Sequence, residues 1–252
     1  MRSKHPITND NNDSGKITKV LTPRNTPKVE PIKTGSTKRH AICFQKKNTR
    51  EANDANAKSG IRGTAIHHGC ENYLRGLDPG VPDEYQDFWK GLSQYLDWFD
   101  VLHWSERPLR PDWNHLRSDD REVAYVWSTE HKYAGCPDLI GEIGGVRVIA
   151  DFKTSNAPYC ANFPAKGDRI GYGGFRKYSK CAQQMSAYRL ALEERTGYHC
   201  DVALIIVTTP ETTQGIFIDG DQMDMHESRF LKRCEMFHNI KGNNEEAEDC
   251  GS

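Results

Sequence analysis

Residues 135–154 read GCPDLIGEIGGVRVIADFKT, and this stretch decides the fold. Two β-rich runs joined by the Gly-Gly pair at 144–145 predict a hairpin with a two-residue turn. In that hairpin, residues whose numbers sum to 289 face each other across the ladder, and Asp138 and Asp151 are such a pair. Lys153 shares the face of Asp151, because side chains alternate along a strand. The sequence therefore predicts two carboxylates and an ammonium group on one side of a hairpin.

The facing aspartates need a counter-charge, because like charges opposed on a sheet destabilise it. A divalent cation would supply one, and carboxylate oxygens suit Mg²⁺ or Mn²⁺, which also accept phosphate oxygens as ligands. Lys153 would then stabilise the charge that develops on a phosphodiester, or position and deprotonate the attacking water. The alternative is a miscounted hairpin with exposed carboxylates and an ordinary solvated lysine. The apolar residues between 146 and 152 argue against that exposure.

The rest of the chain predicts a mixed α/β domain over residues 40–240, with a central mixed sheet flanked by helices. Asp219 is a candidate N-cap for a last helix, and Gly197 is a candidate C-cap. Apolar periodicity and β-rich runs predict helices at 62–75, 83–100 and 181–197 and strands at 122–127, 202–208 and 215–219.

Both ends differ in composition from this core. Residues 1–39 carry nine Lys or Arg, three acids and four prolines, which predicts a disordered basic arm that either binds an anionic polymer or merely solubilises the chain. Residues 241–252 carry four acids and predict a solvated acidic tail. No apolar run is long enough to span a bilayer, so we expect a soluble, cytoplasmic protein without a membrane partner. The excess of Lys over Arg in the arm argues against a mitochondrial transit peptide.

Residues 160–179 combine basic and aromatic side chains with glycines and show no apolar periodicity, which predicts a flexible loop. Its cations, Arg176 and Lys177 among them, would pair with phosphates while its aromatic rings stack on the bases of a single strand. A plain disordered linker is the alternative.

Four motifs together resemble a known group of enzymes. G-C-P-D at 135–138 and I-A-D-F-K-T at 149–154 resemble the signature of the PD-(D/E)XK nuclease superfamily. G-T-A-I-H at 63–67 and Q-M-S-A-Y at 184–188 are similar to the GT-x-x-H and Q-x-x-x-Y motifs of RecB-like nucleases. That group includes bacteriophage exonucleases and mitochondrial genome maintenance exonucleases. The motifs occur in the family's order over about 125 residues of this chain.

This resemblance implies a single restriction-endonuclease-like domain that hydrolyses DNA with Mg²⁺ or Mn²⁺. It favours an exonuclease that acts at ends or on single strands, in DNA replication, recombination or repair, with partner proteins that it does not identify. The alternatives are a structure-specific or other endonuclease with the same site, or a nucleic-acid-binding protein that keeps the fold without turnover. If the protein is viral, the expected cytoplasm is that of the host.

The resemblance also assigns roles to individual residues. Asp138, Asp151 and Lys153 would be catalytic, and His67 would join the two aspartates as a metal ligand. The sequence alone leaves open whether His67 is instead a hydrogen-bonded surface histidine beside His68. By the same resemblance, Gln184 and Tyr188 would shape the site or hold DNA, and Arg176 and Lys177 of the basic segment are further DNA-binding candidates. From their positions, Glu71 and Glu122 are candidates for carboxylates outside the first set of metal ligands, with a plain helix-face charge as the alternative for Glu71.

Two features depart from the family pattern. Related sequences often have G-T-x-D where this chain has Pro137 before Asp138, and proline removes one donor from the ladder, so Asp138 should sit at a strand start or edge. Some RecB-like nucleases hold an iron-sulfur cluster with cysteines near the C-terminus. Only Cys234 and Cys250 lie there in this chain, and none of its eight cysteines forms a C-x-x-C pair, so we expect reduced thiols and neither an iron-sulfur cluster nor a zinc ribbon.

Overall fold

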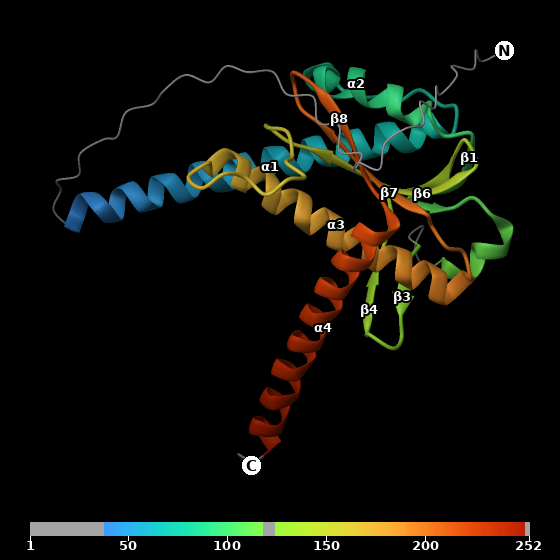
Figure 1. The fold of residues 1–252 in the computed structure, drawn as a ribbon. Helices are drawn as coiled ribbons and strands as arrows, with labels where there is room; N and C mark the ends of the chain where they lie inside the picture. Colours follow the sequence, from blue (N-terminus) through green and yellow to red (C-terminus); the bar gives the residue numbers. More distant parts are fainter. Residues whose placement is uncertain (1–37, 118–123, 250–252) are drawn as a thin grey trace.

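A six-stranded sheet of order β2-β1-β5-β6-β7-β8 forms the centre of the protein (Figure 1). The structure, a computed structural model, describes the backbone of residues 38–117 and 124–249 and the side chains of 53–117, 124–169 and 171–239. The strands are β1 Val101–Ser105, β2 Arg107–Pro108, β3 Val126–Ser128, β4 Tyr133–Gly135, β5 Leu139–Ile143, β6 Val146–Thr154, β7 Val202–Thr208 and β8 Thr213–Ile218. The helices are α1 Lys38–Leu74, α2 Gln86–Leu96, α3 Arg169–Thr196 and α4 Gly220–Asp249, with short 3₁₀ turns at Asp83–Tyr85 and Pro111–Leu116.

The sheet is mixed, and its central hairpin has the predicted register. Strand β6 pairs antiparallel with β5 and parallel with β7, and α3 makes the crossover between β6 and β7. Leu139 faces Ala150 across the hairpin. Gly144 and Gly145 have φ values of 59° and 82°, the left-handed pair that a type I′ turn requires. Asp138 lies one residue before β5, as expected from the missing donor of Pro137.

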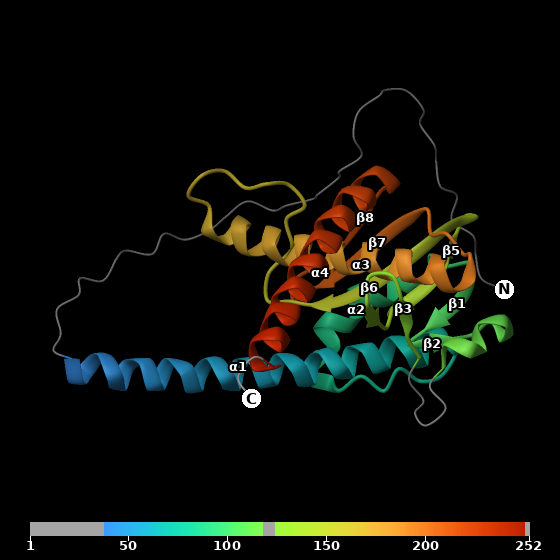
Figure 2. The same cartoon turned by 90° about the horizontal axis from the view of Figure 1, so that it is seen from below.

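Apolar side chains cover both faces of the sheet, and Figure 2 shows helices on either side of it. Ile149 of β6 belongs to the cluster that packs under α3 with Met185, whereas Phe152 belongs to the opposite cluster with Ile66 of α1. Because β6 is buried on both faces, it is a nearly continuous apolar run, and the polar residues within it are conspicuous. The predicted α/β class with a central mixed sheet flanked by helices is confirmed.

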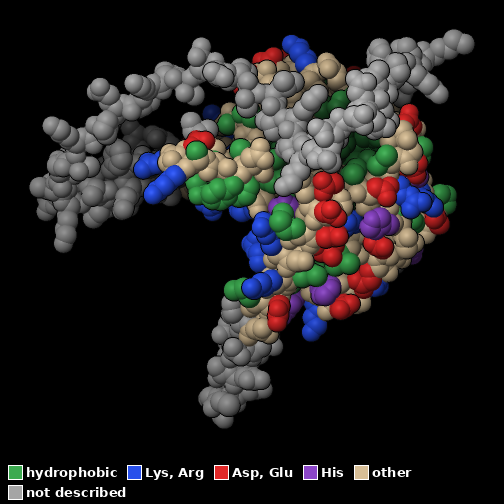
Figure 3. Space-filling model, viewed as in Figure 1, with side chains coloured by type: hydrophobic (Ala, Val, Ile, Leu, Met, Phe, Trp, Pro, Cys, Tyr) green, Lys and Arg blue, Asp and Glu red, His purple; other side chains and the backbone are tan. Residues whose placement is uncertain are grey.

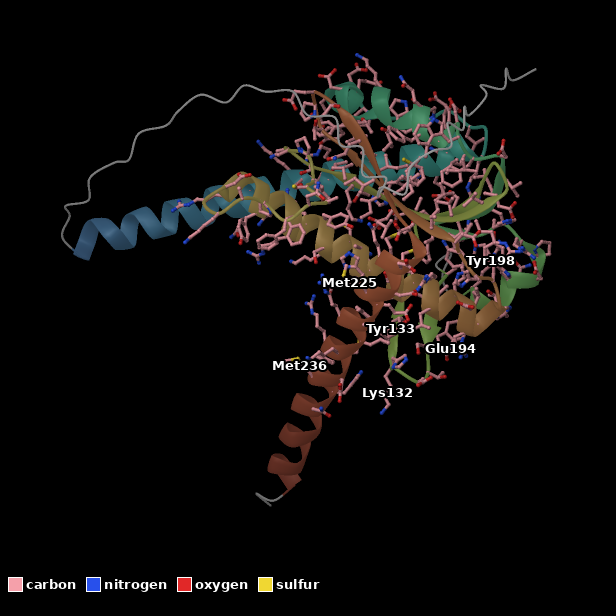
Figure 4. The ribbon with its side chains drawn as sticks, viewed as in Figure 1. Lys132, Tyr133, Glu194, Tyr198, Met225 and Met236 are labelled. Atoms are coloured by element: carbon pink, nitrogen blue, oxygen red, sulfur yellow. The ribbon has the colours of Figure 1, made fainter. Side chains whose placement is uncertain are left out.

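Helix α4 joins this body through α3 and the β3–β4 hairpin. The buried guanidinium of Arg189 on α3 donates to the carboxylates of Asp224 and Glu227 on α4. Tyr133 of β4 lies beside α4 (Figure 4), with its ring edge-on to that of Phe230 at a centroid distance of 4.9 Å. Asp219 caps α4 as predicted, because its Oδ1 accepts a hydrogen bond from the Gln222 N–H at 2.9 Å.

One sequence prediction was wrong in a way that matters for the site. Residues 160–179 were expected to be a flexible loop. Residues 160–168 form no helix or strand, but α3 begins at Arg169. Asp168 is its N-cap, and the Asp168 carboxylate accepts a hydrogen bond from the Gly171 N–H at 2.8 Å. Tyr178 is buried and Phe175 packs against the core, so tertiary burial outweighs the poor helix propensity of the three glycines. The predicted C-cap, Gly197, is confirmed by its φ of 69°.

Several other helices and strands begin or end at residues that differ from the predicted ones. Helix α1 includes the predicted 62–75 but begins at Lys38, the predicted helix at 83–100 is a 3₁₀ turn followed by α2, and β1 was not predicted. Strand β3 begins at Val126, and residues 118–123 lie outside the described residues. So does nearly all of the predicted basic arm, whereas the start of the predicted acidic tail continues α4 to Asp249. None of the described helices is long and apolar enough to cross a bilayer.

We predict that Gly141→Ala destabilises the protein by about 2 kcal/mol, which lowers Tm by roughly 4–8 °C. A Cβ at this position of β5 would lie 2.4 Å from the Val101 carbonyl oxygen and 2.8 Å from the Phe99 ring. The matched control is Gly60→Ala in α1, where a Cβ meets nothing within 4 Å and Tm should rise slightly. Thermal melts followed by circular dichroism measure both, and an unchanged Tm for Gly141→Ala would contradict the packing described.

Candidate active site

The predicted catalytic residues lie where β6 ends and β5 begins, beside the end of β1. Strand β5 pairs with β1 on one side, Ser105 facing Leu139, and with β6 on the other. The chain therefore brings Glu106, which follows β1, to the same end of the sheet as Asp138 and Asp151. Helix α1 crosses this end and adds His67 to the group, within hydrogen-bonding distance of Glu106 and of the Phe152 carbonyl.

Asp138 is fixed by the neighbouring strand. Its Oδ2 accepts a hydrogen bond from the Phe152 N–H at 2.7 Å, so the carboxylate lies across from the end of β6, as the register predicts. Only 8% of the residue is exposed. Burial raises the pKa of Asp138 above its ordinary value, against the lowering effect of the His67 and Lys153 charges.

Asp151 is more deeply buried, with 1% of its surface exposed. Lys153 Nζ forms an ion pair with its Oδ2 at 2.5 Å, and among the described residues neither carboxylate oxygen accepts a hydrogen bond of good geometry. Burial, reinforced by the charge of Asp138, raises the pKa of Asp151 to about 7. Burial alone would lower the pKa of Lys153, but the charges of Asp151 and Asp138 raise it well above its ordinary value, so the amine stays protonated.

His67 connects α1 to both strands of the hairpin. Its Nε2 lies 3.0 Å from the Phe152 carbonyl oxygen, and its Nδ1 lies 3.2 Å from Glu106 Oε1 and 3.7 Å from Asp138 Oδ1. Burial by itself lowers the pKa of His67, but the charge of Asp138 and the hydrogen bond with Glu106 raise it to about 9. Without a cation in the site, the ring is an imidazolium that donates to Glu106 and Phe152.

Glu106 is the site residue that sequence reasoning missed. It has a φ of 57°, which is uncommon for a residue other than glycine, and its N–H donates to the Asp138 carbonyl at 3.0 Å. Ligand atoms of His67, Glu106 and Asp138 all lie within 4.8 Å of one another, which is the spacing of a group that can hold a metal ion. The available signal was an acid directly after the β-rich run at 101–105.

The donor atoms suit a hard divalent cation. Three carboxylates, from Glu106, Asp138 and Asp151, face one lysine and one histidine, so the site carries excess negative charge once His67 is neutral. Asp151 does not belong to the group within 4.8 Å, but its partnerless Oδ1 is a buried acceptor close to Asp138. Carboxylate oxygens with one imidazole nitrogen are ligands that Mg²⁺ and Mn²⁺ accept.

A cleft gives access to this group from the side of α1. It has a volume of about 430 Å³ and is lined by Gly63, Thr64, His67, His68, Glu71 and Glu106. Glu71 lies in the cleft, but its Oε1 is 2.8 Å from the Arg75 guanidinium and 3.6 Å from that of Arg107. Its charge is therefore balanced by arginines, and it does not join the metal-capable group.

The predicted residues of α3 cover the opposite side. Gln184 Nε2 donates to the Tyr188 hydroxyl at 2.7 Å, and the Tyr188 ring lies over Gly135, where a Cβ would be 2.1 Å from it. Burial raises the pKa of Tyr188, and the charges of Asp151 and Asp138 act in the same direction. The pair therefore supports the chain segment that leads into Asp138.

Two cations predicted or observed near the site, Lys177 and Arg62, bind the residues that follow β6. Lys177 Nζ donates to Ser155 Oγ at 3.0 Å, and Arg62 of α1 donates to Asn156 Oδ1 at 3.2 Å. Arg176 is exposed on α3. Glu122, the remaining candidate, lies outside the described residues.

No protein-family model matches the chain, and no curated protein matches it.

We predict that the metal-free protein loses stability as the pH rises from 6 to 9. Folding raises the pKa of His67 from 6.5 to about 9 and that of Asp151 from 3.8 to about 7. Between pH 6 and 9, these two groups bind more protons in the folded state than in the unfolded chain, so the free energy of unfolding falls with increasing pH. Tm measured in EDTA should fall by roughly 4 °C, corresponding to ~1–2 kcal/mol.

His67→Gln should remove the part of this loss that occurs above pH 7, because the imidazolium is then absent. His115→Gln, at an exposed position in the second 3₁₀ turn, should lose stability as the parent does. Equal losses in the parent and His67→Gln would show that His67 does not titrate as described.

Proposed function

We propose that this chain is a metal-dependent deoxyribonuclease with a PD-(D/E)XK fold, which hydrolyses DNA phosphodiester bonds with Mg²⁺ or Mn²⁺. One observation carries the proposal: Asp138 accepts a hydrogen bond from the backbone beside Asp151, and Lys153 forms an ion pair with Asp151. Two buried carboxylates and a charged amine at the end of one hairpin are the arrangement that the four sequence motifs imply. The antiparallel β5–β6 hairpin and the α3 crossover to a parallel β7 are consistent with that fold.

The residues present fit a divalent cation. Asp138, Asp151, His67 and Glu106 would hold it, with His67 deprotonated. Bound there, the ion would stabilise negative charge on the phosphate and lower the pKa of a coordinated water.

The chain's own residues would complete the chemistry. The Lys153 ammonium remains protonated and lies against Asp151, where it can stabilise the charge that develops on the phosphate oxygens. Tyr188 and Gln184 would hold in place the chain segment that leads into Asp138, because the Tyr188 ring fills the space over Gly135.

An exonuclease is favoured by the RecB-like motifs, and an endonuclease would use the same residues. A non-catalytic binding protein is a weaker alternative. Burial raises the pKa of Asp151 to about 7, so keeping that carboxylate charged costs free energy. Binding to DNA requires no carboxylate, whereas holding a divalent cation for hydrolysis does, and this requirement accounts for the cost.

We predict that Mg²⁺ or Mn²⁺ stabilises the protein by about 2.7 kcal/mol at a hundredfold excess over Kd. Asp138→Asn and Glu106→Gln should each remove most of the resulting rise in Tm, because they remove a ligand. Asp87→Asn is the control and should keep the full rise, because Asp87 is a largely exposed acid on α2 that pairs with Lys90. If Asp138→Asn keeps it too, the ion binds elsewhere.

We predict Mg²⁺-dependent cleavage of DNA, reduced at least 100-fold in Asp151→Asn and in Lys153→Ala, because each removes a group that acts on the reacting phosphate. The assay uses end-labelled single-stranded and duplex DNA, with the Asp87→Asn control purified identically. Blocked 5′ or 3′ ends and a circular single strand separate an exonuclease from an endonuclease. Equal rates in the parent and both variants would assign the cleavage to another site or to a contaminant.

A further inference from the structure

The first turns of α3 and the segment before the helix present exposed aromatic rings on a buried support. Phe163 and Tyr172 are 68% and 41% exposed, and their ring centroids lie 5.2 Å apart. Phe163 also lies 5.2 Å from Phe175, which packs against the core and lies 6.3 Å from the buried Tyr178. We call Phe163, Tyr172 and Phe175 the aromatic platform. Because Phe175 packs against the core, it supports Phe163, which in turn contacts Tyr172.

Positive charge surrounds the platform. Residues 160–180 contain five Lys or Arg and one acid, in a chain whose formal net charge is -1. That acid, Asp168, already serves as the N-cap of α3. Lys166, Arg169, Arg176 and Lys177 are exposed, and Figure 3 shows Lys and Arg side chains beside a hydrophobic area over the start of α3.

A cation beside the platform reaches the residues that follow β6. Lys177 Nζ donates to Ser155 Oγ at 3.0 Å and lies 5.7 Å from the centre of the Tyr159 ring. Ser155 is two residues beyond Lys153, so their Cα atoms are at most about 7 Å apart. A polyanion that contacts Lys177 would therefore lie beside the residues that directly follow Lys153.

Exposed aromatic rings ringed by cations are typical of surfaces that bind single-stranded nucleic acid. Duplex bases are stacked on one another, so they offer no free face to an aromatic side chain, whereas unpaired bases do. We propose that the aromatic platform and its cations bind a single strand of nucleic acid and lead it along α3 to the catalytic centre. The last step, delivery to the centre, rests on the proposed nuclease function.

The test measures binding without cleavage. Fluorescence anisotropy of a labelled 20-nucleotide oligo-dT is recorded in EDTA with the full-length chain. Phe163→Ala and Tyr172→Ala should each weaken binding about tenfold, since each removes a stacking surface. Arg169→Ala combined with Arg176→Ala should reduce the salt dependence, by roughly 0.7 in log–log slope for each phosphate that the variant no longer neutralises.

Matched controls lie on the edge strand β8 and on α2. Phe217→Ala removes an aromatic ring that is 46% exposed on β8, and Lys90→Ala removes an exposed cation. Neither should change the affinity. All variants are compared by circular dichroism and Tm, and since Phe163 is largely exposed, Phe163→Ala should fold as the parent does.

The outcomes separate this proposal from the nuclease proposal. If Phe163→Ala weakens oligo-dT binding but the parent never cleaves DNA, the platform stands and the nuclease function fails. If the parent cleaves DNA and the platform variants bind oligo-dT as tightly as the parent, the platform proposal is overturned. It is also overturned if Phe163→Ala abolishes only binding to phosphatidylserine vesicles, or only self-association in size-exclusion chromatography.

Discussion

The structure of the candidate site depends on the free-energy cost of burying Asp138 and Asp151 at the end of an otherwise apolar hairpin. Asp151 is 1% exposed, and its pKa rises to about 7 because water has been removed from around it and Asp138 lies nearby. A buried charge of this kind persists only when partners offset its desolvation. Lys153 and the Phe152 N–H provide part of that compensation to Asp151 and Asp138, respectively. The remaining excess of acceptors is what makes the site suitable for a cation.

Both helical layers contribute to holding these groups in place. Helix α1 approaches β6 closely at Gly63, where a Cβ would lie 3.9 Å from the Thr154 hydroxyl oxygen, and one turn later it delivers His67 to the Phe152 carbonyl. Helix α3 presses Tyr188 onto Gly135 from the other face. Hydrogen bonds also hold the strained backbone of Glu106 in place. Its N–H donates to the Asp138 carbonyl, and its carboxylate accepts a hydrogen bond from His67. Helix α1 therefore supplies His67 to the site, and α3 supports the segment that leads into Asp138.

The sequence predicted the hairpin well because a two-glycine turn fixes the register, which pairs Leu139 with Ala150 directly beside Asp138 and Asp151. His67 was predictable only through its motif, since no local pattern tells which strand a helix will cross. Glu106 was missed because it lies far from Asp138 along the chain, and only the pairing of β1 with β5 brings them together. The start of α3 was missed because local propensity, with three glycines, favours a loop, whereas burial of Tyr178 and Cys181 favours the helix.

That helix changes what the basic, aromatic segment can do. A flexible loop would lose conformational entropy each time it ordered on a ligand, and the cost would reduce its affinity. In α3 the backbone of Tyr172 and Phe175 is already ordered, and Phe175 packs against the core. The ring of Phe163, which precedes the helix, lies against both of these rings. The same helix carries Lys177 at the exit of β6 and Tyr188 over Gly135. Under the two proposals, a single strand bound at the start of α3 would lie at a fixed distance from Asp138 and Asp151. Binding energy from bases far from the metal site would then help to position the phosphate.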